Sequence, residues 1–124
     1  MATNRLPVYN KLRQMFVQFQ MSTQKNPINV KRGAIAKIEE EIIEMMVDVC
    51  YADSASDDSS LQDRLAFIGM AESRLRDVEI RVRILHDLKF LRNKGFDAML
   101  KLEDNAAKQL IGWRNSIDKK IEKK

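Results

Sequence analysis

The sequence is poor in the residues that interrupt helices and in those that stabilise small folds through disulfides or metal sites. Its 124 residues include one cysteine, two prolines, four glycines and one histidine, and only 6% are aromatic. A single cysteine, Cys50, excludes an internal disulfide and suits a reducing cytoplasm. A single histidine, His86, excludes the paired Glu-x-x-His motifs that di-iron bundles need on two helices. Four scattered glycines exclude a glycine-rich phosphate loop.

Long apolar runs are also missing. No segment approaches the roughly 18 apolar residues of a membrane span, and residues 1–10 contain no apolar signal core. We therefore expect a cytoplasmic protein with no membrane partner. A chain of this length fits one domain, 1–124, and can bury a core without disulfides or metals.

The net charge is only +4, but the charges occur in blocks. Residues 1–37 carry seven Lys or Arg and no acid, and residues 38–63 carry nine acids and no base. Residues 64–94 then carry eight bases against four acids, and residues 95–124 carry seven against five. Such basic blocks mark surfaces for nucleic acid or acidic partners, or they pack beside the acidic block.

Four amphipathic helices are predicted, at about 7–23, 29–53, 59–93 and 96–121. Met, Leu, Ile, Glu, Lys and Arg are common and favour helix, and no strand pattern competes. Pro7 suits the start of a helix, and the segment Gln24 to Pro27 suits a break between helices. The small polar run Asp53–Ser60 suits a loop, in which Asp58 or Ser59 could cap the next helix. Gly95 suits the left-handed position past a helix end. Together these signals predict an all-α, antiparallel up-down-up-down four-helix bundle.

The predicted third helix has two apolar sides. One side is a regular stripe that includes Leu61, Leu65, Ile68, Leu75 and Val78 and would face the core. The opposite side would carry a second apolar set, which a monomeric bundle would leave in water. We expect this second set to form an oligomer or partner interface, unless a loop or the N-terminal segment covers it. Its members are Ile80, Ile84, Leu88 and Leu91.

Arginine dominates the flanks of the same helix. Its planar guanidinium suits phosphates and interfacial carboxylates. We expect the basic set to contact nucleic acid or a protein partner; the alternative is that it forms a solvated flank paired with the acids of the second helix. The set comprises Lys31, Arg32, Lys37, Arg74, Arg76, Arg81, Arg83 and Arg92.

No catalytic constellation can be assembled from the remaining polar residues. Asp87 is next to His86, but neighbours on a helix diverge by about 100°, so the two cannot act as a base and its orienting acid. The acids Glu39–Glu41, Glu44 and Asp48 lie mostly opposite the apolar stripe, which indicates a solvated or paired face. Trp113 falls on the apolar stripe of the fourth helix and is interpreted as a core anchor. We therefore expect no enzyme activity, no metal site and no cofactor.

Several short segments resemble a known family. They are Leu85-His86-Asp87-Leu88-Lys89, then the run from Lys94 through Gly95-Phe96 to Leu100, then Leu110-Ile111-Gly112-Trp113. Together with Arg81 and Arg83, they resemble the second half of the accessory variability determinant (Avd) proteins of diversity-generating retroelements. Related bundle proteins are encoded in ribosomal-RNA intervening sequences. The first half is similar more loosely, at Asn26-Pro27 to Arg32 and at Ala52-Asp53-Ser54.

The resemblance implies a non-catalytic homo-oligomer, a ring of five bundles with a basic surface. It also implies two partners, the reverse transcriptase of the retroelement and its RNA or DNA. The protein would hold the polymerase and nucleic acid together during mutagenic retrohoming. The alternative is a structural or adaptor bundle of the intervening-sequence type that binds only proteins. A bundle enzyme is the third reading, and it lacks the histidine and carboxylate ligands that it would need.

Overall fold

The computed structural model describes residues 6–54 and 61–123, and all of their regular structure is helical. The elements are α1 (Pro7–Thr23), α2 (Ile28–Val30), the π-helical turn η2 (Lys31–Ile35), α3 (Ala36–Ser54), α4 (Leu61–Asp87) and α5 (Asn93–Glu122). Because α2, η2 and α3 follow one another without a break, the described residues form four long helices. The predicted all-α class is confirmed. The caps expected at Asp58 or Ser59 lie outside the described residues.

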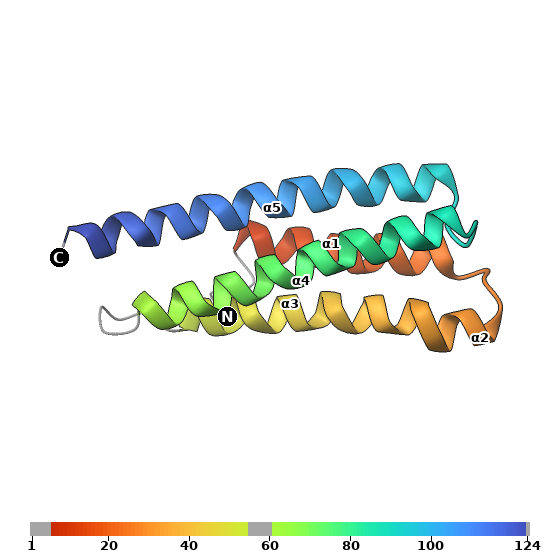
Figure 1. Ribbon diagram of the computed structural model, residues 1–124, viewed down its shortest axis with the longest axis horizontal. Helices are drawn as coiled ribbons and strands as arrows, with labels where there is room; N and C mark the ends of the chain where they lie inside the picture. Colours follow the sequence, from red (N-terminus) through yellow and green to blue (C-terminus); the bar gives the residue numbers. More distant parts are fainter. Residues whose placement is uncertain (1–5, 55–60, 124) are drawn as a thin grey trace.

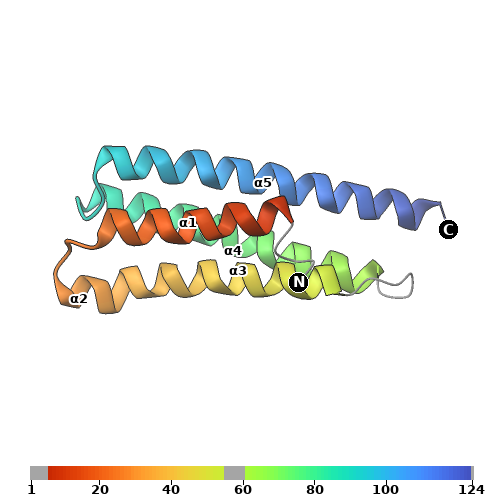
Figure 2. The same ribbon diagram turned by 180° about the vertical axis from the view of Figure 1, so that it is seen from behind.

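Successive long helices point in opposite directions along the long axis of the molecule (Figures 1 and 2). Helix α3 packs most extensively against α4, α4 against α5, α5 against α1, and α1 against α3. This order places the four helices around a single core. Helix α5 extends well past the first residue of α1 (Figure 1). The α1–α2 connection and the α4–α5 turn meet at one end of the molecule, which we call the turn end.

Helix α1 begins and ends where the residues at its two boundaries predict. Pro7 occupies the first turn, and Leu6 before it is extended, because the proline ring disfavours the α region in the preceding residue. At the other end, the Thr23 hydroxyl donates to the carbonyl oxygen of Phe19 over 2.7 Å. The side chain of Asn26 then donates to the carbonyl oxygen of Phe90 over 2.9 Å. This bond ties the α1–α2 connection to the α4–α5 turn.

The core follows the helical spacing of the apolar residues. Helix α1 buries Val8, Leu12, Met15 and Phe19. The other three helices contribute stripes of the same spacing, and each fully buried aliphatic or aromatic side chain contributes roughly 1.5–3 kcal/mol. These stripes contain Ile38, Ile42, Met45, Val49, Ala52, Leu61, Ile68, Ala71, Leu75, Val78, Val82, Leu85, Met99, Ala106, Leu110 and Ile117.

The second long helix is irregular near its start. Within η2 the backbone widens, and the amide of Ala36 donates to the carbonyl oxygen of Lys31, five residues back. Gly33 lies inside this turn, and a Cβ atom added there would meet no atom within 4 Å. Glycine weakens a regular α-helix, and the π-helical turn forms around it. It sets Lys31 and Arg32 apart from the regular stripe of α3.

Helix α4 ends at Asp87, earlier than the predicted residue 93. Lys89 adopts a left-handed conformation with φ 68°, so the left-handed residue is a lysine and the expectation for Gly95 was wrong. The chain turns inward after Lys89, and Leu91 is only 3% exposed in the core. The assignment of Leu91 to an outer interface was therefore wrong, because it assumed that the helix continued past Leu88.

Gly95 lies in the first turn of α5, where it serves close packing. A Cβ atom at this position would lie 2.7 Å from the Ser22 Oγ atom and 2.8 Å from its Cβ atom. Such distances are too short for any side chain at residue 95 unless α1 or α5 shifts. The glycine therefore allows α5 to begin directly against the last turns of α1.

Candidate interaction surface on helix α4

Three apolar side chains form an exposed strip along the last turns of α4 and into the turn that follows. Ile80, Ile84 and Leu88 are 53%, 50% and 60% exposed. Residues four apart lie on the same face of a helix, and the Leu88 amide still donates to the carbonyl oxygen of Ile84 over 2.9 Å. We call Ile80, Ile84 and Leu88 the apolar strip. None of the described residues covers it.

One side of the apolar strip faces α3. There the Arg81 Nε atom donates to the Asp77 Oδ2 atom over 2.9 Å. This hydrogen bond raises the pKa of Arg81, and the charge of Glu41 on α3 contributes to the same shift. Arg81 therefore stays charged, with Asp77 balancing its charge, and it borders the strip on the α3 side.

The other side of the apolar strip faces α5 and carries Arg76 and Arg83. These residues lie four positions before and three positions after Ile80, so all three side chains share one region of the helix surface. Both arginines are exposed, and neither forms an ion pair with the residues that the structure describes. The α5 side of the strip is thus the more cationic one.

Arg74, in contrast, is held inside the α3–α4 interface. Its Nε atom lies 3.0 Å from the Asp48 Oδ2 atom, and its Nη1 atom lies 3.8 Å from the Glu41 Oε2 atom. Lys37 joins the same group through Glu41 at 3.3 Å. Burial raises the pKa of Asp48, and the positive charge of Arg74 acts against that shift. Arg74 and Lys37 therefore follow the alternative given above, in which the basic residues pair with acids of the second helix.

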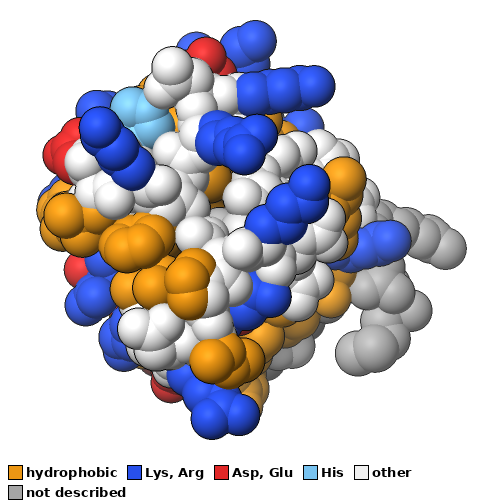
Figure 3. Space-filling view, turned by 90° about the vertical axis from the view of Figure 1, so that its right-hand side faces the viewer, with side chains coloured by type: hydrophobic (Ala, Val, Ile, Leu, Met, Phe, Trp, Pro, Cys, Tyr) orange, Lys and Arg blue, Asp and Glu red, His pale blue; other side chains and the backbone are white. Residues whose placement is uncertain are grey.

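The remaining members of the predicted basic set lie toward the turn end. Lys31 and Arg32 belong to η2, and Arg92 precedes α5 as its N-cap residue. None of these three forms an ion pair with another described residue. Figure 3 views this end of the molecule, where orange hydrophobic side chains gather on the left and lower left with blue Lys and Arg side chains around them. The structure therefore places five unpaired cations of the set on α4 and at the turn end.

His86 has a structural environment at the turn end. Its ring stacks on Phe96 with centroids 4.0 Å apart, and its Nε2 atom lies 2.7 Å from the Asn93 Oδ1 atom. The stack connects the last turn of α4 to the first turns of α5. Asp87 is exposed beside it.

Glu103 is a buried carboxyl group that its sequence pattern did not bring to attention. It is 1% exposed, and neither carboxyl oxygen has a hydrogen-bond partner among the residues that the structure describes. Its pKa is raised to about 8, mainly by burial and also by the negative charge of Glu79, while the positive charge of Arg83 opposes the shift. Glu103 lies four residues after Met99 and three before Ala106, on the apolar stripe of α5. An acid on that stripe was the signal that could have identified it.

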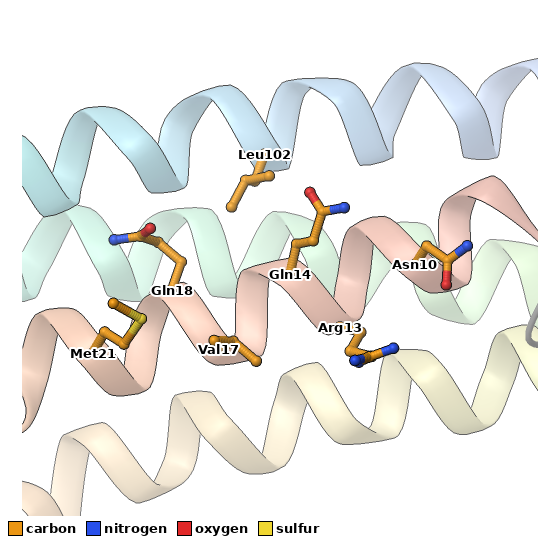
Figure 4. Close-up of a pocket in the computed structure, with 7 residues that line it drawn as sticks. All are labelled: Asn10, Arg13, Gln14, Val17, Gln18, Met21 and Leu102. Atoms are coloured by element: carbon orange, nitrogen blue, oxygen red, sulfur yellow. The ribbon is translucent and has the colours of Figure 1, made fainter.

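A cavity of about 540 Å³ lies between α1 and α5. Figure 4 shows Gln14 of α1 and Leu102 of α5 extending toward one another across it, with Arg13 farther from α5. Its polar side chains are amides and a single guanidinium. No nucleophile or general base lines it.

The described residues contain no cluster of three or more His, Cys, Asp or Glu side chains that could hold a metal ion. Among the same residues, no helix combines the length and the apolar character needed to cross a membrane. No protein-family model matches the chain, and no curated protein matches its sequence.

Proposed function

We propose that this chain is a non-catalytic, self-associating protein that binds nucleic acid and a reverse transcriptase. In this proposal the antiparallel up-down-up-down bundle is the subunit of a cytoplasmic homo-oligomer, with five copies by resemblance to the Avd proteins. The assembly would hold the reverse transcriptase of a diversity-generating retroelement on its RNA or DNA during mutagenic retrohoming. The resemblance to Avd proteins supplies the identity of the polymerase and the number of copies.

The single observation that carries the proposal is the apolar strip bordered by charged side chains. Ile80, Ile84 and Leu88 are each at least half exposed. An apolar row in water, rimmed by polar groups, is typical of a protein interface. The Asp77–Arg81 pair on one side and Arg76 with Arg83 on the other could fix the register of a second copy.

The nucleic-acid part of the proposal is supported by the five cations of the predicted basic set that have no acidic partner among the described residues. These are Lys31, Arg32, Arg76, Arg83 and Arg92. Arg74, Arg81 and Lys37 belong to ion pairs within the subunit and are not part of this proposed contact. A phosphate backbone attracts unpaired cations and releases counterions as it binds.

Self-association can be tested by light scattering. The double variant Ile84→Glu with Leu88→Glu should be monomeric, because it places two like charges on the apolar strip of each copy. The matched control is Ile43→Glu with Val47→Glu, an exposed apolar pair four residues apart on α3. It should keep the wild-type mass. An unchanged mass for the strip variant would remove the strip from the interface.

Nucleic-acid binding can be tested by gel shift with RNA at about 50 and about 200 mM salt, between which phosphate-dominated binding weakens steeply. We expect strong binding at the lower salt and much weaker binding at the higher. Binding that does not respond to salt, or no binding at low salt, would contradict the proposal. Copurification with a reverse transcriptase encoded beside the gene tests the polymerase partner.

A second candidate function is that of an adaptor bundle of the intervening-sequence type, which binds only proteins. The pairing of Arg74 with Asp48 and of Arg114 with Glu72 favours it, because intramolecular pairs consume part of the basic charge. This function predicts an oligomer or a protein complex but no gel shift. The RNA experiment therefore separates the two candidates.

A further inference from the structure

We propose that a cavity at the turn end binds a phosphate group of a single-stranded nucleic acid. This end cavity has a volume of about 490 Å³ and lies between the α1–α2 connection and the α4–α5 turn. The proposal rests on the nucleic-acid part of the function above and assigns a site to it. Three of the four cations of the cavity lie outside the basic set predicted from the sequence.

The charge of the end cavity has one sign. Lys25, Lys89, Arg92 and Lys94 line it, and no acidic side chain does. None of these four cations forms an ion pair within the described part of the chain. Elsewhere Arg74, Arg81 and Arg114 are bound to acids. A concave surface of one sign concentrates the field and attracts an anion.

The walls of the end cavity are held in place by contacts within the protein. The Asn26 Nδ2 atom donates to the carbonyl oxygens of Phe90 at 2.9 Å and Thr23 at 3.2 Å. The Gln18 Nε2 atom donates to the Ser22 Oγ atom over 2.7 Å. Since these bonds fix both loops before a ligand arrives, less ordering entropy is lost on binding.

The start of α5 adds a favourable dipole to the cations. Arg92 and Lys94 flank the first residue of this 30-residue helix, and Gly95 also lines the cavity. The N-cap residue makes no side-chain hydrogen bond to the first turn, and the first turn contains no acid. The positive end of the helix is therefore left without an anionic side chain, which favours a bound anion.

The shape and lining of the end cavity favour a single strand. Its volume is on the scale of a small-molecule pocket, too small to admit a rigid duplex. Phe90 contributes an aromatic side chain to the wall, and Gln24 and Ser22 contribute neutral hydrogen-bonding groups. A cationic groove with an aromatic side chain is the usual arrangement for flexible single strands, whose bases stack on aromatic rings.

The test compares two charge-matched variants in fluorescence anisotropy with a short fluorescein-labelled oligouridine. The first variant is Lys89→Gln with Lys94→Gln, which removes two cations from the end cavity. The second is Lys119→Gln with Lys120→Gln, which removes two exposed cations near the other end of α5. Circular dichroism verifies that both variants remain helical. Because every position is exposed, neither variant should disturb the core.

We expect the end-cavity variant to bind about tenfold more weakly at low salt. Its slope of log affinity against log salt should fall by about 1.4, since each lost contact with a single strand removes about 0.7. The control should change affinity less than about twofold by the same reasoning. In wild-type protein, the amide NMR signals of Lys94 and Gly95 should move during the titration.

Equal losses in the two variants would overturn the end cavity as a site while leaving nucleic-acid binding itself in place. Unmoved signals for Lys94 and Gly95 in a binding wild-type protein would overturn it as well. Absence of oligouridine binding at low salt by a wild-type protein that does shift RNA in the gel would overturn this inference alone. Absence of binding in both experiments would also overturn the nucleic-acid part of the proposed function.

Discussion

Arg74 of α4 donates from its Nε atom to the Asp48 Oδ2 atom on α3 over 3.0 Å, and this bond places a charged pair in the most extensive helix interface of the molecule. Asp48 is buried, whereas the Arg74 side chain is 31% exposed. Asp48 loses hydrating water when the protein folds, and its pair with the Arg74 guanidinium compensates for this loss.

Removing the Arg74 side chain should lower the stability of the protein. We expect Arg74→Met to lower the free energy of unfolding by about 2 kcal/mol, less than the cost of breaking a fully buried pair, because Arg74 keeps access to water. Urea titration measures the change. The control is Arg81→Met, whose exposed pair with Asp77 should contribute less than about 1 kcal/mol. Equal effects of the two variants would contradict a special role for Asp48–Arg74.

Glu103 should make stability depend on pH. Its pKa is raised from 4.5 to about 8, mainly by burial. Between these values the folded state binds more protons than the unfolded state, so stability should fall as pH rises from about 4.5 to about 8 and then level off. One pKa unit corresponds to about 1.4 kcal/mol, and the full effect is therefore several kcal/mol.

Urea titrations across this pH range test the effect with two variants. Glu103→Leu should flatten this part of the profile and stabilise the protein at high pH, because it replaces an unpartnered carboxyl group with an apolar side chain. The exposed neighbour Asp104 provides the control, and Asp104→Asn should keep the slope. A wild-type slope that survives in Glu103→Leu would assign the pH dependence to other groups.

The close approach of α1 and α5 predicts opposite effects at two glycines. Gly95→Ala should destabilise the protein by about 1–3 kcal/mol, the usual cost of overpacking, because the new methyl group meets Ser22. At Gly112 a Cβ atom would meet nothing within 4 Å. There an alanine should stabilise the helix by roughly 0.5–1 kcal/mol through its better propensity. Thermal unfolding of the two variants compares the signs directly.

Leu91 and Leu88 should respond differently to truncation, although they are close in sequence. Leu91→Ala should cost about 2–4 kcal/mol because it opens a cavity in the core, and it should leave the oligomer mass unchanged. Leu88→Ala should cost little stability because Leu88 is 60% exposed. A mass change in Leu91→Ala without loss of stability would show that the residue acts in assembly after all.

The sequence predicted most of the helices because strong signals stand at their ends. Pro7 and the segment up to Pro27 bound α1, and the apolar spacing of each long helix selects its buried face. The end of α4 was missed because Leu88 and Leu91 continue the apolar pattern through a turn. Its left-handed residue is Lys89, which carries no sequence signal for that conformation. A sequence pattern does not reveal which way such a turn directs the chain.

The candidate surface was predicted only in outline. Exposure of Ile80, Ile84 and Leu88 follows from helical spacing, which is a local property. The division of the arginines into paired and unpaired members depends on which acids α3 places opposite them, and this depends on the packing of α3 against α4. The cations of the end cavity come from two connections about 64 residues apart in sequence, since Asn26 bonds to Phe90. Only the folded chain brings them together.

The π-helical turn η2 amounts to one extra residue in an otherwise regular helix. A one-residue deletion between Lys31 and Ile35 would convert the turn into regular α-helix and leave the preceding segment in nearly the same orientation relative to α3, because the wide turn absorbs the extra residue. Asn26 would then keep its alignment with Phe90, and Lys25 would stay at the end cavity. The extra residue can therefore be lost without separating the two connections that form the end cavity.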